Sequence, residues 1–174
     1  MPQSETVRDS ILDAAEVRAR ASGYSGFSFR EIAADVGIKS ASVHYHFPTK
    51  ADLAHELMDR YRTKAMEFLG EPADVTEGMA RLVELFQMAS RQGEMCLCGA
   101  LGAASASLPM VVQHSAASFS DALIQWLEAL PAQEHSLPFP APTIVALLEG
   151  ALLLSVTAKN PDFFDNAIAP LAIR

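Results

Sequence analysis

The chain has 174 residues, a mass of 18.7 kDa and a formal net charge of −8. Half of the residues are apolar and a fifth are charged, which excludes wholesale disorder and fits one domain or two small ones. The longest apolar run, from Ile144 to Ala158, is shorter than a membrane span of ~20 residues and contains Glu149, and we see no secretory signal. Two cysteines, Cys96 and Cys98, are too few for a disulfide framework. We therefore expect a soluble, cytoplasmic protein.

Charge is distributed unevenly along the chain. Residues 1–68 contain nine Lys/Arg and ten Asp/Glu, a net charge of −1, whereas residues 69–174 contain four and eleven, a net charge of −7. Such a break suggests two units with different partners. The segment from Gly70 to Asp74 lies near the break and has the composition of a connector.

Helical periodicity runs through the whole chain, and no convincing strand pattern is present, which predicts an all-α fold. Apolar residues at spacings of three and four predict a helix over residues 5–22, which ends at Gly23. Ser28 and Glu31 form a capping-box pattern that opens a second helix, which ends before Gly37.

A short third helix fits between Gly37 and Pro48, and Thr49 with Asp52 predicts the cap of a long fourth helix. Two short helices joined by a glycine turn, the second rich in small polar and aromatic residues, are typical of a helix-turn-helix. Such a helix fits the DNA major groove, about 12 Å wide, where lysines neutralise phosphates and polar side chains reach base edges.

The stretch from Ile11 to Leu53 resembles the N-terminal domain of the TetR family of transcriptional regulators. The resemblance rests on Ile11 to Ala15, Gly23-Tyr24, Phe29 to Ala33, Val36 to Ile38 and, most specifically, Ser42 to Leu53. It implies a three-helix DNA-binding domain over residues 1–48, a connecting helix over 49–68 and a helical regulatory and dimerisation domain over 69–174.

By this resemblance, Gly37 to His46 forms the turn and recognition helix, and Lys50 opens the connecting helix. Many relatives have Tyr in place of His44 and Gly or Pro in place of Ala41, differences that bear on base preference and phosphate contacts. Relatives also usually have bulky apolar residues where this chain has Arg18, Ala19 and Arg20, a difference that we expect to change packing rather than function. We expect DNA contacts from ten residues: Ser28, Arg30, Lys39, Ser40, Ala41, Ser42, His44, Tyr45, His46 and Lys50.

The acidic remainder is expected to sense a ligand and to dimerise. Apolar residues predict helices over residues 79–90 and 95–107 and a third that begins near Pro109 and runs to about Leu130. The segment 143–158 is apolar on nearly all sides and therefore needs cover from its own core and from a second copy. Candidate ligand contacts are Phe86, Met88, Cys96 and Trp126, and candidate dimer contacts are Leu148, Leu152, Val156, Phe163 and Phe164.

The pattern therefore predicts a homodimeric repressor that binds a palindromic double-stranded DNA operator and is released by a small-molecule effector. The alternative is a redox or electrophile sensor that acts through the thiols of Cys96 and Cys98. A DNA-binding protein with a filled, unresponsive body is a weaker possibility. We expect no enzyme, cofactor or metal, because catalytic motifs are absent and His44, His46 and His55 lack further ligands at a recognised spacing.

Overall fold

The computed structural model describes residues 6–103, 108–131 and 136–171, and every helix and contact below lies within these ranges. Nine α-helices and no strand are found there, which confirms the all-α prediction. The helices are α1 (Val7–Ser22), α2 (Phe29–Val36), α3 (Ser40–His46), α4 (Lys50–Leu69), α5 (Val75–Gln92), α6 (Leu97–Gly102), α7 (Met110–Glu128), α8 (Ala141–Ala158) and α9 (Pro161–Ile168). Two short 3₁₀ turns, η1 (Tyr24–Gly26) and η3 (Ala169–Leu171), complete the set.

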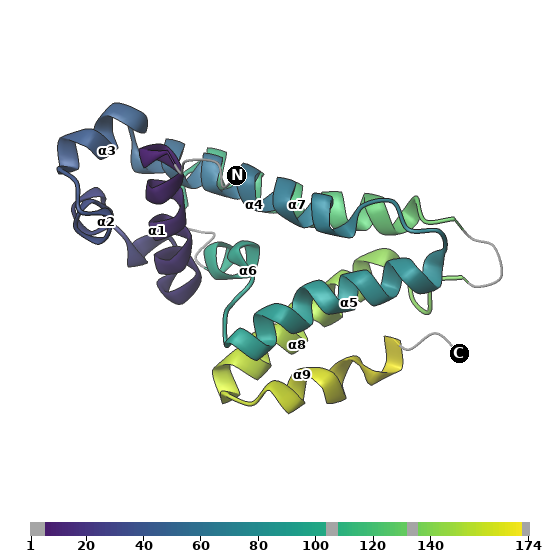
Figure 1. The fold of residues 1–174 in the computed structure, drawn as a ribbon. Coiled ribbons are helices and arrows are strands. Elements are labelled where there is room, and N and C mark those ends of the chain that lie inside the picture. Colours follow the sequence, from purple (N-terminus) through teal and green to yellow (C-terminus); the bar gives the residue numbers. More distant parts are fainter. Residues whose placement is uncertain (1–5, 104–107, 132–135, 172–174) are drawn as a thin grey trace, which may run out of the picture.

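Helices α1 to α3 form a head at one end of the molecule, and the remaining helices form an elongated body (Figure 1). Helix α4 leaves the head and packs along α7, while α5 packs on α8, and α8 packs on α9. The short α6 lies between α1 and the body and contacts both α1 and α7. The head therefore touches the body through α4 and through the α1–α6 contact.

Local capping explains where the helices of the head begin and end. The Thr49 hydroxyl accepts from the Asp52 N–H, and the Asp52 carboxylate accepts from the Thr49 N–H, so the predicted cap of α4 is confirmed. Ser28 caps α2 through the Glu31 N–H, but its hydroxyl donates to the Glu31 carboxylate, so only half of that capping box forms. Gly37 ends α2 at a φ of 75°, a left-handed conformation that favours glycine.

The head has its own apolar centre, to which each of its helices contributes. Ile11 of α1, Ile32 of α2 and Val43 of α3 are completely buried, and Phe47 and Leu53 close the centre from the start of α4. These side chains fix the angle between α2 and α3, because a close-packed core leaves little freedom for rotation. The core therefore determines which face of α3 points outward.

The helix expected over residues 95–107 is much shorter in the structure. Helix α6 has six residues, begins after Cys96 and ends at Gly102, while residues 104–107 lie outside the described ranges. Two glycines, at positions 99 and 102, weaken helix formation in this segment, which explains why apolar composition alone gave too long a helix.

The buried face of α8 corrects the predicted dimer surface. Leu148, Leu152 and Phe164 are completely buried in the core of a single chain, so their side chains are not free to meet a second copy. Val156 is half-buried and Phe163 is 39% exposed. The exposed apolar side chains of α8 are instead Leu153 and Leu154, at 48% and 51% exposure. The prediction failed for Leu148 and Leu152 because α8 is apolar on all sides and has no sequence signal for its inner face, and for Phe164 because it is the buried one of two adjacent phenylalanines of α9.

Helix α8 is also the one helix in the described ranges that is long and apolar enough to cross a membrane. It packs against α5, α7 and α9, and its inner side chains, such as Ile144 and Leu148, belong to the main core. Helix packing within the fold therefore accounts for much of its apolar character.

Candidate nucleic-acid interface

Helix α3 presents a polar and aromatic face on the outside of the head. Val43 anchors the helix in the core, while Tyr45 on the opposite side is 85% exposed. The other predicted DNA contacts of this segment are exposed or half-buried: Lys39, Ser40, Ala41, Ser42, His44 and His46. A seven-residue helix with small side chains is narrow enough for the major groove, and this face offers hydrogen-bonding groups for phosphates and base edges.

The turn between α2 and α3 is held by backbone hydrogen bonds. The Ile38 N–H donates to the Ala33 carbonyl at 2.9 Å, and the Gly37 N–H donates to the Ala34 carbonyl at 3.3 Å. This glycine-terminated helix end directs the chain sharply into α3. The orientation of α3 thus depends on backbone geometry as well as on the buried Val43.

Ring contacts position the two histidines of α3. The His44 ring meets the Phe29 ring edge-on, with centroids 4.6 Å apart, and the His46 ring meets Tyr45 with centroids 5.2 Å apart. Such edge-to-face pairs contribute about 0.5–1.5 kcal/mol beyond area burial. Position 44 therefore combines a contact to α2 with an exposed imidazole edge.

Lys50 has a second partner that the sequence pattern did not reveal. Its Nζ lies 4.4 Å from the centre of the Phe27 ring and 4.5 Å from that of Tyr24, so the ammonium packs over two aromatic faces. Burial lowers the pKa of Lys50, and the nearby Glu31 carboxylate partly opposes this effect. Lys50 thus stabilises the turn after α1, and its predicted phosphate contact stays a prediction.

Ser28 and Arg30 lie at the start of α2. The Ser28 side chain is occupied by the Glu31 N–H and carboxylate, whereas Arg30 is exposed. Of the two, Arg30 has the reach and the charge for a phosphate contact.

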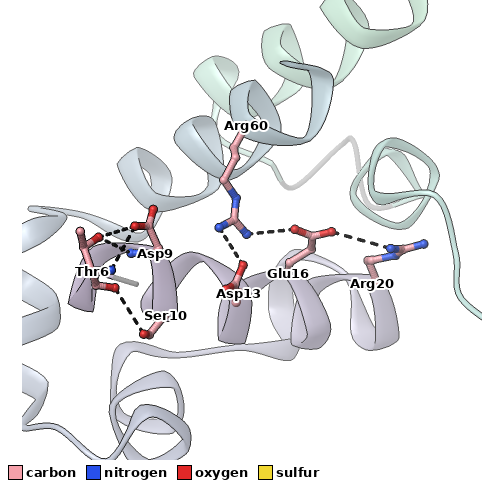
Figure 2. Close-up of polar contacts among 7 residues, drawn as sticks. All are labelled: Thr6, Asp9, Ser10, Asp13, Glu16, Arg20 and Arg60. Atoms are coloured by element: carbon pink, nitrogen blue, oxygen red, sulfur yellow. Dashed lines mark hydrogen bonds and ion pairs between the residues drawn. The ribbon is translucent and has the colours of Figure 1, made fainter. Parts of the chain in front are cut away.

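Arg60 joins the connecting helix to the head (Figure 2). Its guanidinium, on α4, lies between two carboxylates of α1, 2.8 Å from Asp13 and 3.0 Å from Glu16. The other Glu16 oxygen faces Arg20 at 3.7 Å. Arg60, Glu16 and Arg20 are each less than 20% exposed, so solvent screens these ion pairs less than surface pairs. The network fixes α1 against α4.

We expect Arg60→Met to lower the free energy of unfolding by about 1–3 kcal/mol, because it leaves two carboxylates without their shared partner. Methionine keeps much of the aliphatic stem, which limits the loss of packing. Arg62→Met on the same helix is the control, since Arg62 pairs with the exposed Asp59 and should change stability by at most about 0.5–1 kcal/mol. Urea denaturation of both variants measures the difference, and equal effects would contradict the assigned role of Arg60.

The end of α1 connects the head directly to the body. The Arg20 Nε donates to the Met95 carbonyl at 2.8 Å, and its Nη1 lies 2.8 Å from the Glu94 carboxylate. Gly23 approaches α6 so closely that a Cβ atom at this position would lie 2.9 Å from the Ala100 carbonyl oxygen. Arg20, which departs from the apolar residues of many relatives, therefore ties the head to the segment that precedes α6.

The predicted ligand contacts do not gather at one place. Phe86 and Cys96 are buried, whereas Trp126 donates its indole N–H to the Gly70 carbonyl at 2.9 Å, at the far end of α4. Met88 lines a cavity of about 270 Å³ between α1, α4 and α5. Tyr61 of α4, which was not among the predicted ligand contacts, also lines this cavity.

The sequence analysis also gave no role to Glu149, the one charged residue of α8. Its Oε1 atom is buried without a hydrogen-bond partner in the described part of the chain. Burial raises the pKa of the Glu149 carboxyl, while a hydrogen bond with Cys96 opposes the increase. The Cys96 and Cys98 thiols and the Tyr61 hydroxyl are the other titratable groups that interact with it. A lone charge within an apolar helix was the signal that could have identified this residue.

A raised pKa means that the folded state binds the Glu149 proton more tightly than the unfolded state. Its stabilising effect is complete below the usual value near 4.5 and is lost as the pH rises through the folded-state pKa. We therefore expect Glu149→Gln, which mimics the protonated form, to raise the melting temperature relative to wild type more at pH 8 than at pH 5. Glu84→Gln, at an exposed position of α5, is the control. Thermal denaturation across this range measures the difference in melting temperature between Glu149→Gln and the wild type. A difference that becomes smaller toward high pH would refute the assignment.

The comparisons with known proteins agree with this geometry. The family model described as "Bacterial regulatory proteins, tetR family" matches residues 11–57, which include α2, α3 and the start of α4. HTH-type transcriptional regulator LmrA of Bacillus subtilis (strain 168) is 31% identical over an alignment of 167 positions, and the match covers 88% of this chain and 88% of that protein.

Two solved structures resemble the whole fold. A TetR transcriptional regulator from Legionella pneumophila has a TM-score of 0.82 and 28% identity, covering 96% of this chain and 95% of its own. The multidrug binding protein EbrR complexed with malachite green has a TM-score of 0.66 and 24% identity, with 92% of both chains covered. Regulators of this family are non-enzymatic, in agreement with the prediction that the chain is not an enzyme. The chain belongs to the TetR family of DNA-binding transcriptional regulators.

Proposed function

We propose that the chain is a cytoplasmic, homodimeric repressor that binds a palindromic operator and leaves it when a small molecule binds the body. The exposed face of α3, held by the buried Val43 and led by the 85% exposed Tyr45, is the observation that carries this proposal. In this account residues 1–48 bind DNA, the helix over 49–68 connects, and residues 69–174 sense the effector and dimerise.

The outer face of α8 supports the homodimer. Leu153 and Leu154 continue a stripe of small or apolar positions with Ala146, Gly150 and Thr157, spaced three and four residues apart. Small residues in such a stripe allow a second helix to approach closely, and an isologous interface places the same stripe on both copies. The exposed Phe163 of α9 adds apolar area beside it. Two heads joined in this way present two recognition helices to a palindrome.

The uneven charge supports local rather than general attraction to DNA. The acidic residues 69–174 repel the phosphates, whereas Lys39 and Arg30 are exposed near the face of α3. The few phosphate contacts give an affinity that falls as the salt concentration rises.

The cavity between α1, α4 and α5 supports control by a small molecule. A ligand in this space of about 270 Å³ contacts Arg20 of the head and Met88 of the body at once. EbrR, a relative of the same fold, has been solved with malachite green. A ligand that favours a different position of α1 shifts the population toward heads that no longer fit both half-sites.

The thiol-sensing alternative through Cys96 and Cys98 has weaker support. Burial raises the pKa of Cys96 well above its ordinary value and that of Cys98 to about 11. Because the thiolate is the nucleophile, both groups are poorly reactive at neutral pH. The Cys98 thiol also donates to the Ala116 carbonyl at 3.2 Å, which binds it to α7. We therefore favour non-covalent ligand control.

Titration with DNA fragments that flank the chain's own gene tests the proposal. We expect Tyr45→Ala to weaken binding to the selected fragment roughly 10- to 100-fold, while stability changes by less than about 0.5 kcal/mol. Lys39→Ala should lower the slope of log affinity against log salt by about 2, one phosphate contact for each subunit. The control is Lys64→Ala on α4, also exposed, which should leave the slope unchanged. Equal binding by wild type and both head variants would refute the proposal.

A further inference from the structure

The Glu149 carboxylate contains the one buried carboxylate oxygen without a hydrogen-bond partner in the described part of the chain. Glu149 projects from α8, and its Oε1 atom has no accessible surface and no hydrogen-bond partner within the described residues. Its Oε2 atom lies near α6, only 3.0 Å from the place where a Cβ atom on Gly99 would be. A buried carboxylate oxygen without a partner is destabilising, and native structures rarely keep one without a function.

Tyr61 of α4 and the thiols of Cys96 and Cys98, at the start of α6, are the titratable groups that interact with this carboxylate. Cys96, which precedes α6, lowers the pKa of this carboxyl, and the Tyr61 hydroxyl of α4 donates to the Cys96 sulfur at 3.7 Å. The Tyr61 ring packs at 5.2 Å against the Phe119 ring of α7. A buried carboxylate with an aromatic side chain nearby can recognise an organic cation, through charge and through the electron-rich ring face.

The surroundings do not favour a metal ion. No group of three or more His, Cys, Asp and Glu side chains in the described ranges could hold one. Tyr61 instead links the carboxylate to the cavity of about 270 Å³, because the same ring lines that cavity. The basic residues of the cavity are Arg20, already paired with Glu16 and Glu94, and the exposed Lys64.

We propose that Glu149 binds the positively charged group of the effector, and that the effector is an organic cation whose apolar part occupies the cavity beside Tyr61. This inference rests on the proposed ligand-controlled function and names the chemical class of the ligand. A quaternary or protonated amine supplies the charge that the orphan carboxylate lacks, and it needs no hydrogen bond to the Tyr61 ring.

The position of Glu149 also explains how binding of such a ligand affects the head. A cation at the carboxylate takes the place of the Cys96 thiol and separates it from the Tyr61 hydroxyl. Cys96 directly follows Met95, whose carbonyl accepts the Arg20 hydrogen bond at 2.8 Å. Movement of this short segment therefore acts on Arg20 and on α1, the first helix of the head.

Two molecules of the same shape separate charge from size in the test. The probes are 3-hydroxyphenyltrimethylammonium, a cation, and 3-tert-butylphenol, in which a neutral carbon replaces the nitrogen. Isothermal titration of the full chain should give at least tenfold tighter binding of the cation, about 1.4 kcal/mol. Glu149→Gln should reduce this ratio to about twofold or less, whereas Glu84→Gln, at an exposed position of α5, should keep it.

A wild-type protein that does not prefer the cation, or a Glu149→Gln variant that keeps the preference, would overturn the inference. Thermal denaturation of the Gln variant verifies that it is folded. Operator titration without probe is run in parallel and tests the repressor proposal separately from the cation inference. Selective operator binding without a cation preference removes only the inference, whereas a Glu149-dependent cation preference without operator binding removes only the repressor proposal.

Discussion

Replacing Leu153 and Leu154 together by glutamate should convert the dimer into a monomer and weaken operator binding by more than about 100-fold. Both side chains are about half exposed on the outer face of α8, so the substitutions leave the core of one chain intact. In the dimer they would place four unpaired carboxylates in an apolar interface, and each buried charge without a partner costs several kcal/mol. A monomer binds one half-site and loses the gain of about 10²–10⁴ that joining two binding modules provides.

Sedimentation analysis at micromolar concentration and operator titration measure the two effects. Met110→Glu is the matched control, since Met110 is an apolar residue of α7 that is 84% exposed and lies outside the proposed interface. It should remain dimeric with wild-type affinity. A double variant that sediments as a dimer would show that the subunits meet on another surface.

Gly23→Ala should lower the free energy of unfolding by about 2–5 kcal/mol and change operator affinity. Gly23 has a φ of 67° and a ψ of −163°, a conformation that is essentially restricted to glycine and costs other residues about 1–3 kcal/mol. The added Cβ would also lie 2.9 Å from the Ala100 carbonyl oxygen, so α1 and α6 must separate. Overpacking of this kind costs a further 1–3 kcal/mol or so.

Gly93→Ala separates backbone strain from the loss of the head–body contact. Gly93 also has a positive φ, 68°, but a Cβ atom there would meet nothing within 4 Å, so we expect a loss of about 1–2 kcal/mol. Urea denaturation and operator titration of both variants give the comparison. If Gly23→Ala behaves like Gly93→Ala in both measurements, the contact between α1 and α6 has no role in positioning the head.

The head was predictable from sequence because local rules determine it. Thr49 and Asp52 mark the start of α4, Gly37 marks the end of α2, and the short α3 lies where the pattern predicted it. These signals depend on neighbours a few residues apart, and tertiary packing left them unchanged. The partners of Lys50 escaped prediction, since the rings of Phe27 and Tyr24 reach it through the fold rather than through the sequence.

The body was less predictable because its faces depend on contacts between distant segments. Leu148 and Leu152 are as apolar as Leu153 and Leu154, so composition did not distinguish the core of one chain from an outer surface. The cluster of Tyr61, Cys96 and Glu149 joins three segments that are far apart in the chain, and no sequence spacing connects them. The role of Arg20 likewise required the position of the Met95 carbonyl.

Hydroxyl-radical footprinting of the operator tests most directly whether two α3 helices read a palindrome. We expect the wild-type chain to protect two half-sites on one face of the duplex, with centres about one helical turn or 10 base pairs apart, or a multiple of this. Tyr45→Ala should lose both protections together. A single protected half-site, or protection that persists in Tyr45→Ala, would contradict the claim that two α3 helices read a palindrome.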